Sequence, residues 1–200
     1  MHSLISVIIP AKNRIDLLRQ AARSAQLQPE SKEIIIIDDG SYPALKQRLG
    51  QLGEKVKIIR LSSSTGPANA RNTGLKYVKG QFIAFLDSDD QWNNNFLRTS
   101  LACLQIDQSA SATVCLSNKI LPREWSMKEI LRLHFMNSMK DVFRSLAYVF
   151  NQKRLPRSAP FLGQLSHMVF RRSAINGLRF DPRYKFCGDW KFILDCLGKG

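Results

Sequence analysis

Short apolar runs alternate with amphipathic stretches along the first hundred residues. The run at 34–37 is entirely isoleucine, and it shows no polar alternation, which is typical of a strand buried on both faces of a parallel sheet. The four strands expected from these runs cover residues 4–9, 34–37, 56–61 and 82–86.

The stretch after the first strand has the period of an amphipathic helix, and Asn13 precedes it as a candidate N-cap. Its apolar positions are Ile15, Leu18, Ala21, Ala22 and Ala25. Two further helices are expected at 43–52 and 67–79, the second entered through Gly66 and Pro67. This alternation of strands and helices predicts an α/β layer fold with right-handed crossovers.

The pattern loosens after residue 93. The remaining elements are expected as a helix at 95–106, a strand at 112–117, amphipathic helices over 124–150, a loop at 155–160, a strand at 167–170 and a helix at 188–198. Apolar residues recur at helical spacing between 127 and 149 with basic residues between them, which fits either packing on the domain or docking on an anionic membrane. We therefore divide the chain at residue 117, into halves 1–117 and 118–200 of one domain.

Composition narrows the class of protein. Hydrophobic residues make up 44% and charged residues 23%, which excludes a wholly disordered chain. No apolar run has the length of a membrane span, and the first residues lack the basic start of a signal peptide. Four cysteines without CxxC spacing indicate reduced thiols, so a cytoplasmic location is expected.

Charge is the unusual property of this sequence. The formal net charge is +14 and the isoelectric point is about 10.0. Residues 119–185 carry 14 basic and 4 acidic side chains. This excess favours an anionic partner such as a phosphorylated small molecule, an acidic membrane surface or nucleic acid.

Two acidic clusters stand directly after expected strands. Asp38 and Asp39 follow the second strand, and Asp87, Asp89 and Asp90 follow the fourth. In open α/β sheets, ligands bind just outside these strand ends. Clustered carboxylates without nearby His or Cys favour a hard cation, so the pattern predicts a nucleotide diphosphate together with Mg²⁺ or Mn²⁺.

Several segments together resemble the successive motifs of glycosyltransferase family 2. They are SVIIPAKNR (6–14), IIIIDDGS (34–41), GPANARNTG (66–74), FIAFLDSDDQW (82–92), VFRRSAINGLRFD (169–181) and GDWKFILDCLGKG (188–200). The resemblance implies a GT-A fold, with a Rossmann-like, mostly parallel central sheet flanked by helices. It also implies that residues 1–117 bind a nucleotide-sugar donor, that residues 118–200 form the acceptor side of the same domain, and that the transfer inverts the anomeric carbon.

The resemblance also implies roles for individual residues. Pro10 and Asn13 would lie at the donor site, and Asp38 or Asp39 would bind the nucleobase or ribose. Arg71 would lie near the base or diphosphate. Asp87 would contact the ribose or the metal's shell, Asp89 would ligate the metal, and Asp189 would be the general base. These six donor-site positions, the metal ligand and the base are Pro10, Asn13, Asp38, Asp39, Arg71, Asp87, Asp89 and Asp189.

Such an enzyme would move a sugar from a UDP-, GDP- or dTDP-sugar to a glycan or lipid-linked acceptor in cell-surface polysaccharide synthesis. It would work in the cytoplasm, on the inner face of the membrane where a lipid-linked acceptor is used. Nucleic acid is not an expected partner.

Three features depart from the family pattern. Lys12 stands where an aromatic residue is usual, and Gly188 replaces the usual Glu before the base. Family members also ordinarily continue beyond the position of Gly200, so the resemblance implies a fold that this sequence does not complete. A basic nucleic-acid-binding module, a nucleotidyltransferase and a non-catalytic relative of the family stay open as alternatives.

Overall fold

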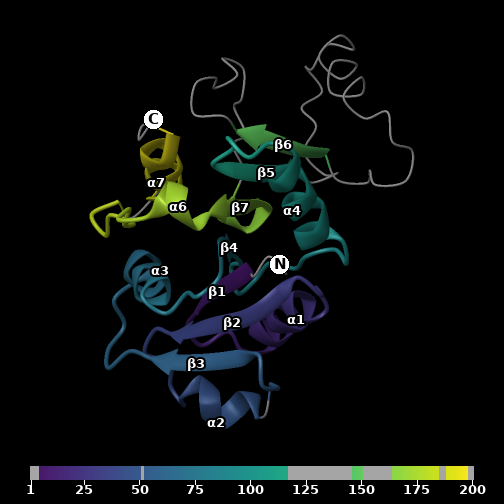
Figure 1. Cartoon of the computed structure of the whole chain (residues 1–200). Coiled ribbons are helices and arrows are strands. Elements are labelled where there is room, and N and C mark those ends of the chain that lie inside the picture. Colours follow the sequence, from purple (N-terminus) through teal and green to yellow (C-terminus); the bar gives the residue numbers. More distant parts are fainter. Residues whose placement is uncertain (1–4, 51, 117–145, 151–163, 185–187, 198–200) are drawn as a thin grey trace, which may run out of the picture.

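The structure is a computed structural model that describes residues 5–50, 52–116, 146–150, 164–184 and 188–197. Strands and helices alternate along the first half, as the hydrophobic pattern predicts (Figure 1). In chain order the elements are β1 (Ile5–Ala11), α1 (Ile15–Gln26), β2 (Ser31–Asp38), α2 (Leu45–Leu49), β3 (Val56–Arg60), α3 (Pro67–Leu75), β4 (Phe82–Phe85), α4 (Phe96–Ile106), β5 (Ala112–Leu116), β6 (Leu146–Phe150), the 3₁₀ turn η1 (Leu165–His167), β7 (Met168–Arg171), α6 (Arg172–Ile175) and α7 (Gly188–Leu197).

Within the described residues, seven strands form one sheet in the order β3-β2-β1-β4-β7-β5-β6. β1 pairs in parallel with β2 and β4, and β2 pairs in parallel with β3. The carboxyl ends of these four strands therefore share one edge of the sheet. β7, β5 and β6 extend the sheet by antiparallel pairing. The expected α/β fold is confirmed, and its parallel part lies in β1 to β4.

The sheet separates two apolar layers. On one face, α1 and α4 pack against side chains that include Val7, Ile9 and Ile34. On the other face, Phe85 of β4 packs with Phe170 of β7 and with residues of α7. Ile34–Ile37 is buried throughout, which confirms the prediction of a strand covered on both faces.

α3 packs closely on β1. A Cβ atom placed on Gly74 would lie only 2.5 Å from Cγ2 of Ile8, so no larger residue fits here without movement of the helix or of Ile8. The sequence pattern predicts that this helix extends to residue 79, but in the structure it ends at Leu75. This contact matters for the site because α3 also carries Arg71 and Asn72.

Among the described residues of the second half, β6 differs from the predicted element, and the short helix α6 was not predicted. The pattern predicts helix over 124–150, but residues 146–150 form β6, which pairs antiparallel with β5. The sequence of this segment contains Tyr148, Val149 and Phe150, which favour a strand, and the edge of β5 supplies a pairing partner. Residues 124–145 and the loop at 155–160 lie outside the described residues.

None of the helices within the described ranges is long and apolar enough to cross a membrane.

Candidate active site

A cavity of about 580 Å³ opens at the carboxyl ends of β1, β2 and β4. Five of the sequence-predicted residues line it: Pro10, Asp39, Arg71, Asp87 and Asp89. Lys12 and Arg14 add positive charge to the wall. The fold thus gathers residues from four separate motifs at the strand edge where the sequence predicts a ligand.

Asp39 ties the β2 end to the start of α3. Its carboxylate accepts hydrogen bonds from the backbone N–H groups of Thr65 (2.7 Å) and Gly66 (3.0 Å) and from the hydroxyl of Ser64 (2.9 Å). Burial by itself raises the pKa of Asp39, but these hydrogen bonds outweigh it and lower the pKa below its usual value. Asp39 is therefore a carboxylate at neutral pH.

Gly40 makes this approach of the two loops geometrically feasible. Its φ is +71°, and a Cβ atom there would lie 2.7 Å from the backbone nitrogen of Ser64. A side chain at this position would both strain the backbone and push the Ser64 loop away from Asp39.

Asp38 and Asn13 lie outside the cavity lining. Asp38 is 1% exposed, and its oxygens accept hydrogen bonds from the backbone N–H groups of Ser41 and Leu45. The Oδ1 atom of Asn13 accepts a hydrogen bond from the backbone N–H of Tyr42. Both side chains hold the turns around the site together.

The predicted N-cap role of Asn13 is wrong. Arg14 occupies the N-cap position of α1, and it makes no side-chain capping bond. Asn13 instead has a left-handed backbone with φ of 58°, a conformation that Asn tolerates better than most residues. Its side chain is engaged with Tyr42, so it is not available to the helix end.

Asp87 and Asp89 extend from the end of β4. The backbone N–H of Asp87 donates to the hydroxyl of Ser166, which fixes the turn after the strand. One oxygen of Asp89 pairs with the guanidinium of Arg14 at the exposed mouth of the cavity. Trp92, which follows this turn, is buried and stacks on Phe96.

Arg71 joins Asp87 of the cavity lining to Asp189, which lies outside that lining and far away in the sequence. Its Nη2 atom lies 2.6 Å from Oδ1 of Asp87, and its Nη1 atom lies 2.9 Å from Oδ1 of Asp189. Burial raises the pKa of Asp189, Arg71 opposes that rise, and Asp87 adds to it, with a net increase. A carboxylate with a raised pKa is a better proton acceptor than an ordinary Asp.

The residues present fit a metal ion whose shell a ligand completes. Within the described part of the chain, no group of three His, Cys, Asp or Glu side chains could hold a metal by itself. Asp87 and Asp89 nevertheless supply two carboxylates to the lining of one cavity, and Mg²⁺ characteristically takes one or two carboxylates together with substrate phosphates and water.

Three residues of the site carried no separate sequence signal. Arg14 pairs with Asp89, Ser166 fixes the turn at Asp87, and Asn72 binds the backbone of Phe180. Arg14 and Asn72 lie in the segments SVIIPAKNR and GPANARNTG, which carry the resemblance to the family, but their contacts could not be predicted from the sequence. Ser166 comes from a part of the chain without any motif, and only the tertiary fold brings it to β4.

Several curated proteins match all or part of this sequence. An uncharacterized glycosyltransferase of Rickettsia felis is 40% identical over 104 residues, covering 50% of this chain and 17% of that protein. The UDP-Glc:alpha-D-GlcNAc-diphosphoundecaprenol beta-1,3-glucosyltransferase WfgD of Escherichia coli is 33% identical over 103 residues, covering 50% of this chain and 41% of that protein. The succinoglycan biosynthesis protein ExoO of Rhizobium meliloti is 28% identical over 204 residues (98% and 56%). The chain thus spans between 17% and 56% of the length of these relatives.

Solved structures share the fold. TarS of S. aureus (residues 1–349) has a TM-score of 0.70 at 21% identity, with 97% of this chain and 55% of that one covered. The mannosyltransferase PcManGT of Pyrobaculum calidifontis has a TM-score of 0.61 at 18% identity, with 91% of this chain and 48% of that one covered. These likenesses confirm the expected GT-A fold. The family model for glycosyl transferase family 2 matches residues 6–178, and the chain therefore belongs to glycosyltransferase family 2.

Proposed function

We propose that this chain transfers a sugar from a nucleotide-diphosphate donor to a glycan or lipid-linked acceptor, with inversion at the anomeric carbon, in cell-surface polysaccharide synthesis. The observation that carries the proposal is the cavity in which Asp39, Asp87 and Asp89 converge, with Asp189 held beside them through Arg71. Acidic donor-site residues and a base with a raised pKa are what such a transfer needs.

The donor would occupy the cavity at the carboxyl edge of the sheet. Pro10 and Asp39 line this cavity. Asp39 keeps its charge, and it would exchange the hydrogen bonds from the Ser64 and Thr65 hydroxyls for bonds from the hydroxyl groups of a nucleoside. Asp38 and Asn13 would contribute by holding the surrounding turns in place. TarS has been solved with UDP and with UDP-GlcNAc, and PcManGT with GDP-Man and Mn²⁺, which supports a UDP- or GDP-sugar here.

Asp87 and Asp89 would hold a Mg²⁺ or Mn²⁺ ion, which supplies positive charge next to the leaving diphosphate. Asp89 is paired with Arg14 in this structure, so it would exchange that contact for the ion. Lys12 and Arg14 line the same wall and would contribute further positive charge to the diphosphate.

Asp189 would act as the general base. The hydroxyl oxygen of the acceptor attacks the anomeric carbon from the face opposite the diphosphate, and the carbon–oxygen bond to the diphosphate breaks. The hydroxyl proton passes to the Asp189 carboxylate. A single displacement inverts the configuration, so an α-linked donor gives a β-linked product. Because Gly188 stands where the family usually has Glu, Asp189 is the one carboxylate at positions 188 and 189.

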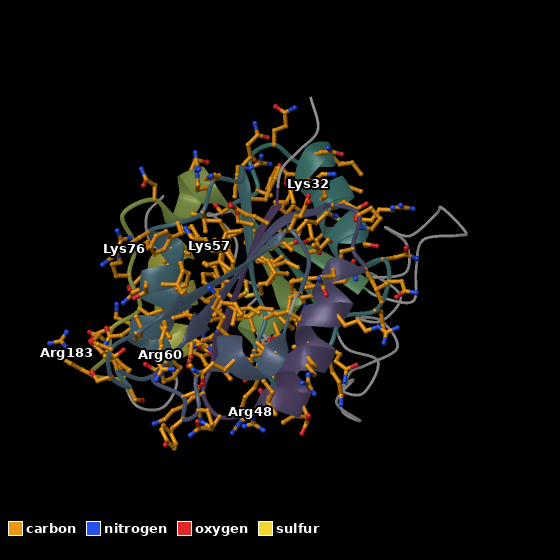
Figure 2. The ribbon with its side chains drawn as sticks, turned by 90° about the horizontal axis from the view of Figure 1, so that it is seen from below. Lys32, Arg48, Lys57, Arg60, Lys76 and Arg183 are labelled. Atoms are coloured by element: carbon orange, nitrogen blue, oxygen red, sulfur yellow. The ribbon has the colours of Figure 1, made fainter. Side chains whose placement is uncertain are left out.

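The acceptor side of the proposal includes contact with an anionic membrane surface. Residues 43–81, which we call the basic segment, carry eight basic side chains and one acidic side chain. All of these basic residues except Arg71 are exposed. Figure 2 looks onto this side of the ribbon and labels Arg48 of α2, Lys57 and Arg60 of β3, and Lys76 just after α3. An exposed basic surface on the cytoplasmic side favours anionic lipids, which suits a lipid-linked acceptor such as the one in the name of WfgD.

A donor panel tests the proposal. Purified chain is incubated with UDP-, GDP- and dTDP-sugars, with Mn²⁺, with Mg²⁺ or with chelator, and release of nucleoside diphosphate is measured. We expect release from one nucleotide class, dependent on the divalent ion and lost in Asp89→Ala. Nucleotide binding without any hydrolysis or transfer would support the non-catalytic alternative, and salt-sensitive duplex binding without a nucleotide response would support the nucleic-acid alternative.

A further inference from the structure

We propose that Arg71 is a positioning residue, which holds the base Asp189 and the donor-site residue Asp87 in fixed register by bridging one oxygen of each. This inference rests on the proposed function. It differs from the role that the family resemblance implies, in which Arg71 lies against the donor itself.

The first observation is how the guanidinium is divided between the two acids. Nη2 donates to Oδ1 of Asp87 and Nη1 donates to Oδ1 of Asp189, while Arg71 is only 6% exposed. Among the described residues, the Oδ2 atoms of Asp87 and Asp189 accept no hydrogen bond. Each acid therefore has one oxygen fixed by Arg71 and one oxygen left for chemistry.

The second observation is that α3 anchors the segment that carries Asp189. Asn72, next to Arg71, donates to the carbonyl of Phe180 and accepts from its backbone N–H, both at 2.8 Å. The ring of Phe180 stacks on Phe192 of α7 at a centroid distance of 4.0 Å. The Arg71 guanidinium lies 5.5 Å from the Phe180 ring centroid. α7 is thus tied to α3 by packing as well as by the ion pair.

The third observation is that α3 itself has little freedom to shift. Gly74 places the helix backbone against Ile8 of β1, and Asp39 binds the N–H groups at the start of the helix. β1 and β4 are neighbours in the sheet, and Asp87 follows β4 directly. Arg71 therefore fixes the positions of both acids relative to α3 and the central strands.

Charge alone does not explain this arrangement. A lysine would supply the same charge, but its single ammonium group lacks the flat fork of N–H groups that reaches two carboxylates at once. Without Arg71, no guanidinium would offset the repulsion between the carboxylates of Asp87 and Asp189, and they would separate. A displacement of about 1 Å at a reacting group costs on the order of 100-fold in rate.

The test combines Arg71→Met, Arg71→Lys, Asp189→Asn and the double variant Arg71→Met/Asp189→Asn in steady-state kinetics with the best donor. Arg98→Met, which removes a surface arginine paired with Glu30, is the matched control. We expect Arg71→Met to lower kcat by about 100-fold with donor KM changed less than about threefold, and Arg71→Lys to lower kcat by at least about tenfold. In the Asp189→Asn background, Arg71→Met should lower kcat by clearly less than it does in the wild type, because the part of its effect that passes through Asp189 is already lost and only the part that passes through Asp87 remains.

Three results would overturn the inference. The first is a raised donor KM with unchanged kcat in Arg71→Met, and the second is a wild-type kcat in Arg71→Lys. The third is a loss of kcat on Arg71→Met that is equally large in the wild-type and Asp189→Asn backgrounds. If Arg71→Met does not fold, as judged by circular dichroism, Arg71→Lys takes its place in the same cycle.

Amide hydrogen exchange of α7 is a separate readout that needs no activity. We expect faster exchange at residues 188–193 in Arg71→Met than in wild type, whereas unchanged exchange would show that Arg71 does not hold α7. A wild-type chain that transfers no sugar would overturn the proposed function, and the exchange measurement would still decide whether Arg71 fixes Asp189.

Discussion

Asp189 is the residue whose environment most directly determines what this site can do. Burial raises its pKa, Arg71 acts in the opposite direction, and Asp87 adds to the rise. The sequence marked Asp189 through its motif, but the raised pKa and the link to Arg71 follow from contacts across 118 positions of the chain. Sequence spacing alone does not reveal such contacts.

The raised pKa predicts the acid side of the pH profile. A base works only when deprotonated, so kcat/KM should fall as pH drops through the pKa of Asp189. That fall should begin at a higher pH than for an ordinary Asp, whose pKa is about 3.9. Circular dichroism at each pH controls for unfolding. A kcat/KM that stays constant down to the pH at which the fold is lost contradicts the assignment.

Asp39 should stabilise the fold in a pH-dependent way. Its pKa is lowered in the folded chain, so its contribution is present above the unfolded pKa of about 3.9 and is lost as pH falls through the lower folded pKa. Asp39→Asn should lower the free energy of unfolding at pH 7 by about 1–3 kcal/mol, and this difference should shrink below about pH 4. Urea unfolding of Asp39→Asn and of the wild type at about pH 3 and pH 7 measures this difference in stability.

The exposed Asp16, which contacts only Arg19 within the described residues, gives a matched control. Asp16→Asn should change stability by less than about 1 kcal/mol. An Asp39→Asn cost that is equally large at pH 3 and pH 7 would argue against the hydrogen bonds as its source.

At the scale of elements, the hydrophobic pattern predicted β1 to β4 and α1 to α4 because each has a clear period and lies between turn residues. It did not predict β6, since the same apolar residues suit a helix or a strand, and the choice depends on the free edge of β5. It also did not predict that β7 inserts between β4 and β5, because antiparallel order is set by tertiary pairing.

The contact between α3 and β1 predicts a cost for enlarging Gly74. Gly74→Ala places a methyl group 2.5 Å from Cγ2 of Ile8, so α3 or Ile8 must shift, with a loss of about 1–3 kcal/mol of stability. Because α3 carries Arg71, kcat should fall as well. Chemical denaturation and steady-state kinetics measure the two effects.

Ile8→Ala removes the methyl group with which the new Cβ collides. The cost of Gly74→Ala should therefore be smaller in the Ile8→Ala background than in the wild type. If the losses in free energy of unfolding caused by Gly74→Ala and Ile8→Ala are additive, the two side chains do not collide.

At the scale of the whole molecule, the acidic and basic side chains balance in the lining of the cavity, and the excess of positive charge lies outside it. The net charge of +14 alone allowed many anionic partners. The fold places Asp39, Asp87 and Asp89 in one cavity and leaves the basic segment exposed on α2, β3 and the end of α3. The strongly basic region at 119–185 lies mostly outside the described residues, so its amphipathic helices stay a prediction.

The basic segment should bind anionic vesicles. We expect co-sedimentation with vesicles of phosphatidylglycerol and phosphatidylcholine that weakens with salt, and about 1 kcal/mol lost per basic residue removed. Lys46→Glu/Lys55→Glu/Lys76→Glu should reduce binding strongly. Arg19→Glu/Arg23→Glu/Arg98→Glu, on α1 and α4, makes the same change in net charge and should reduce it much less. Equal losses in the two triple variants would mean that only net charge matters.

The transfer rate of Asp189→Asn tests the central claim most directly. Asn preserves the shape of the side chain but cannot accept the proton, so kcat should fall by about 10²–10⁴-fold, while the affinity for nucleoside diphosphate measured by calorimetry stays near the wild-type value. An Asp189→Asn variant that transfers sugar at the wild-type rate would contradict the account.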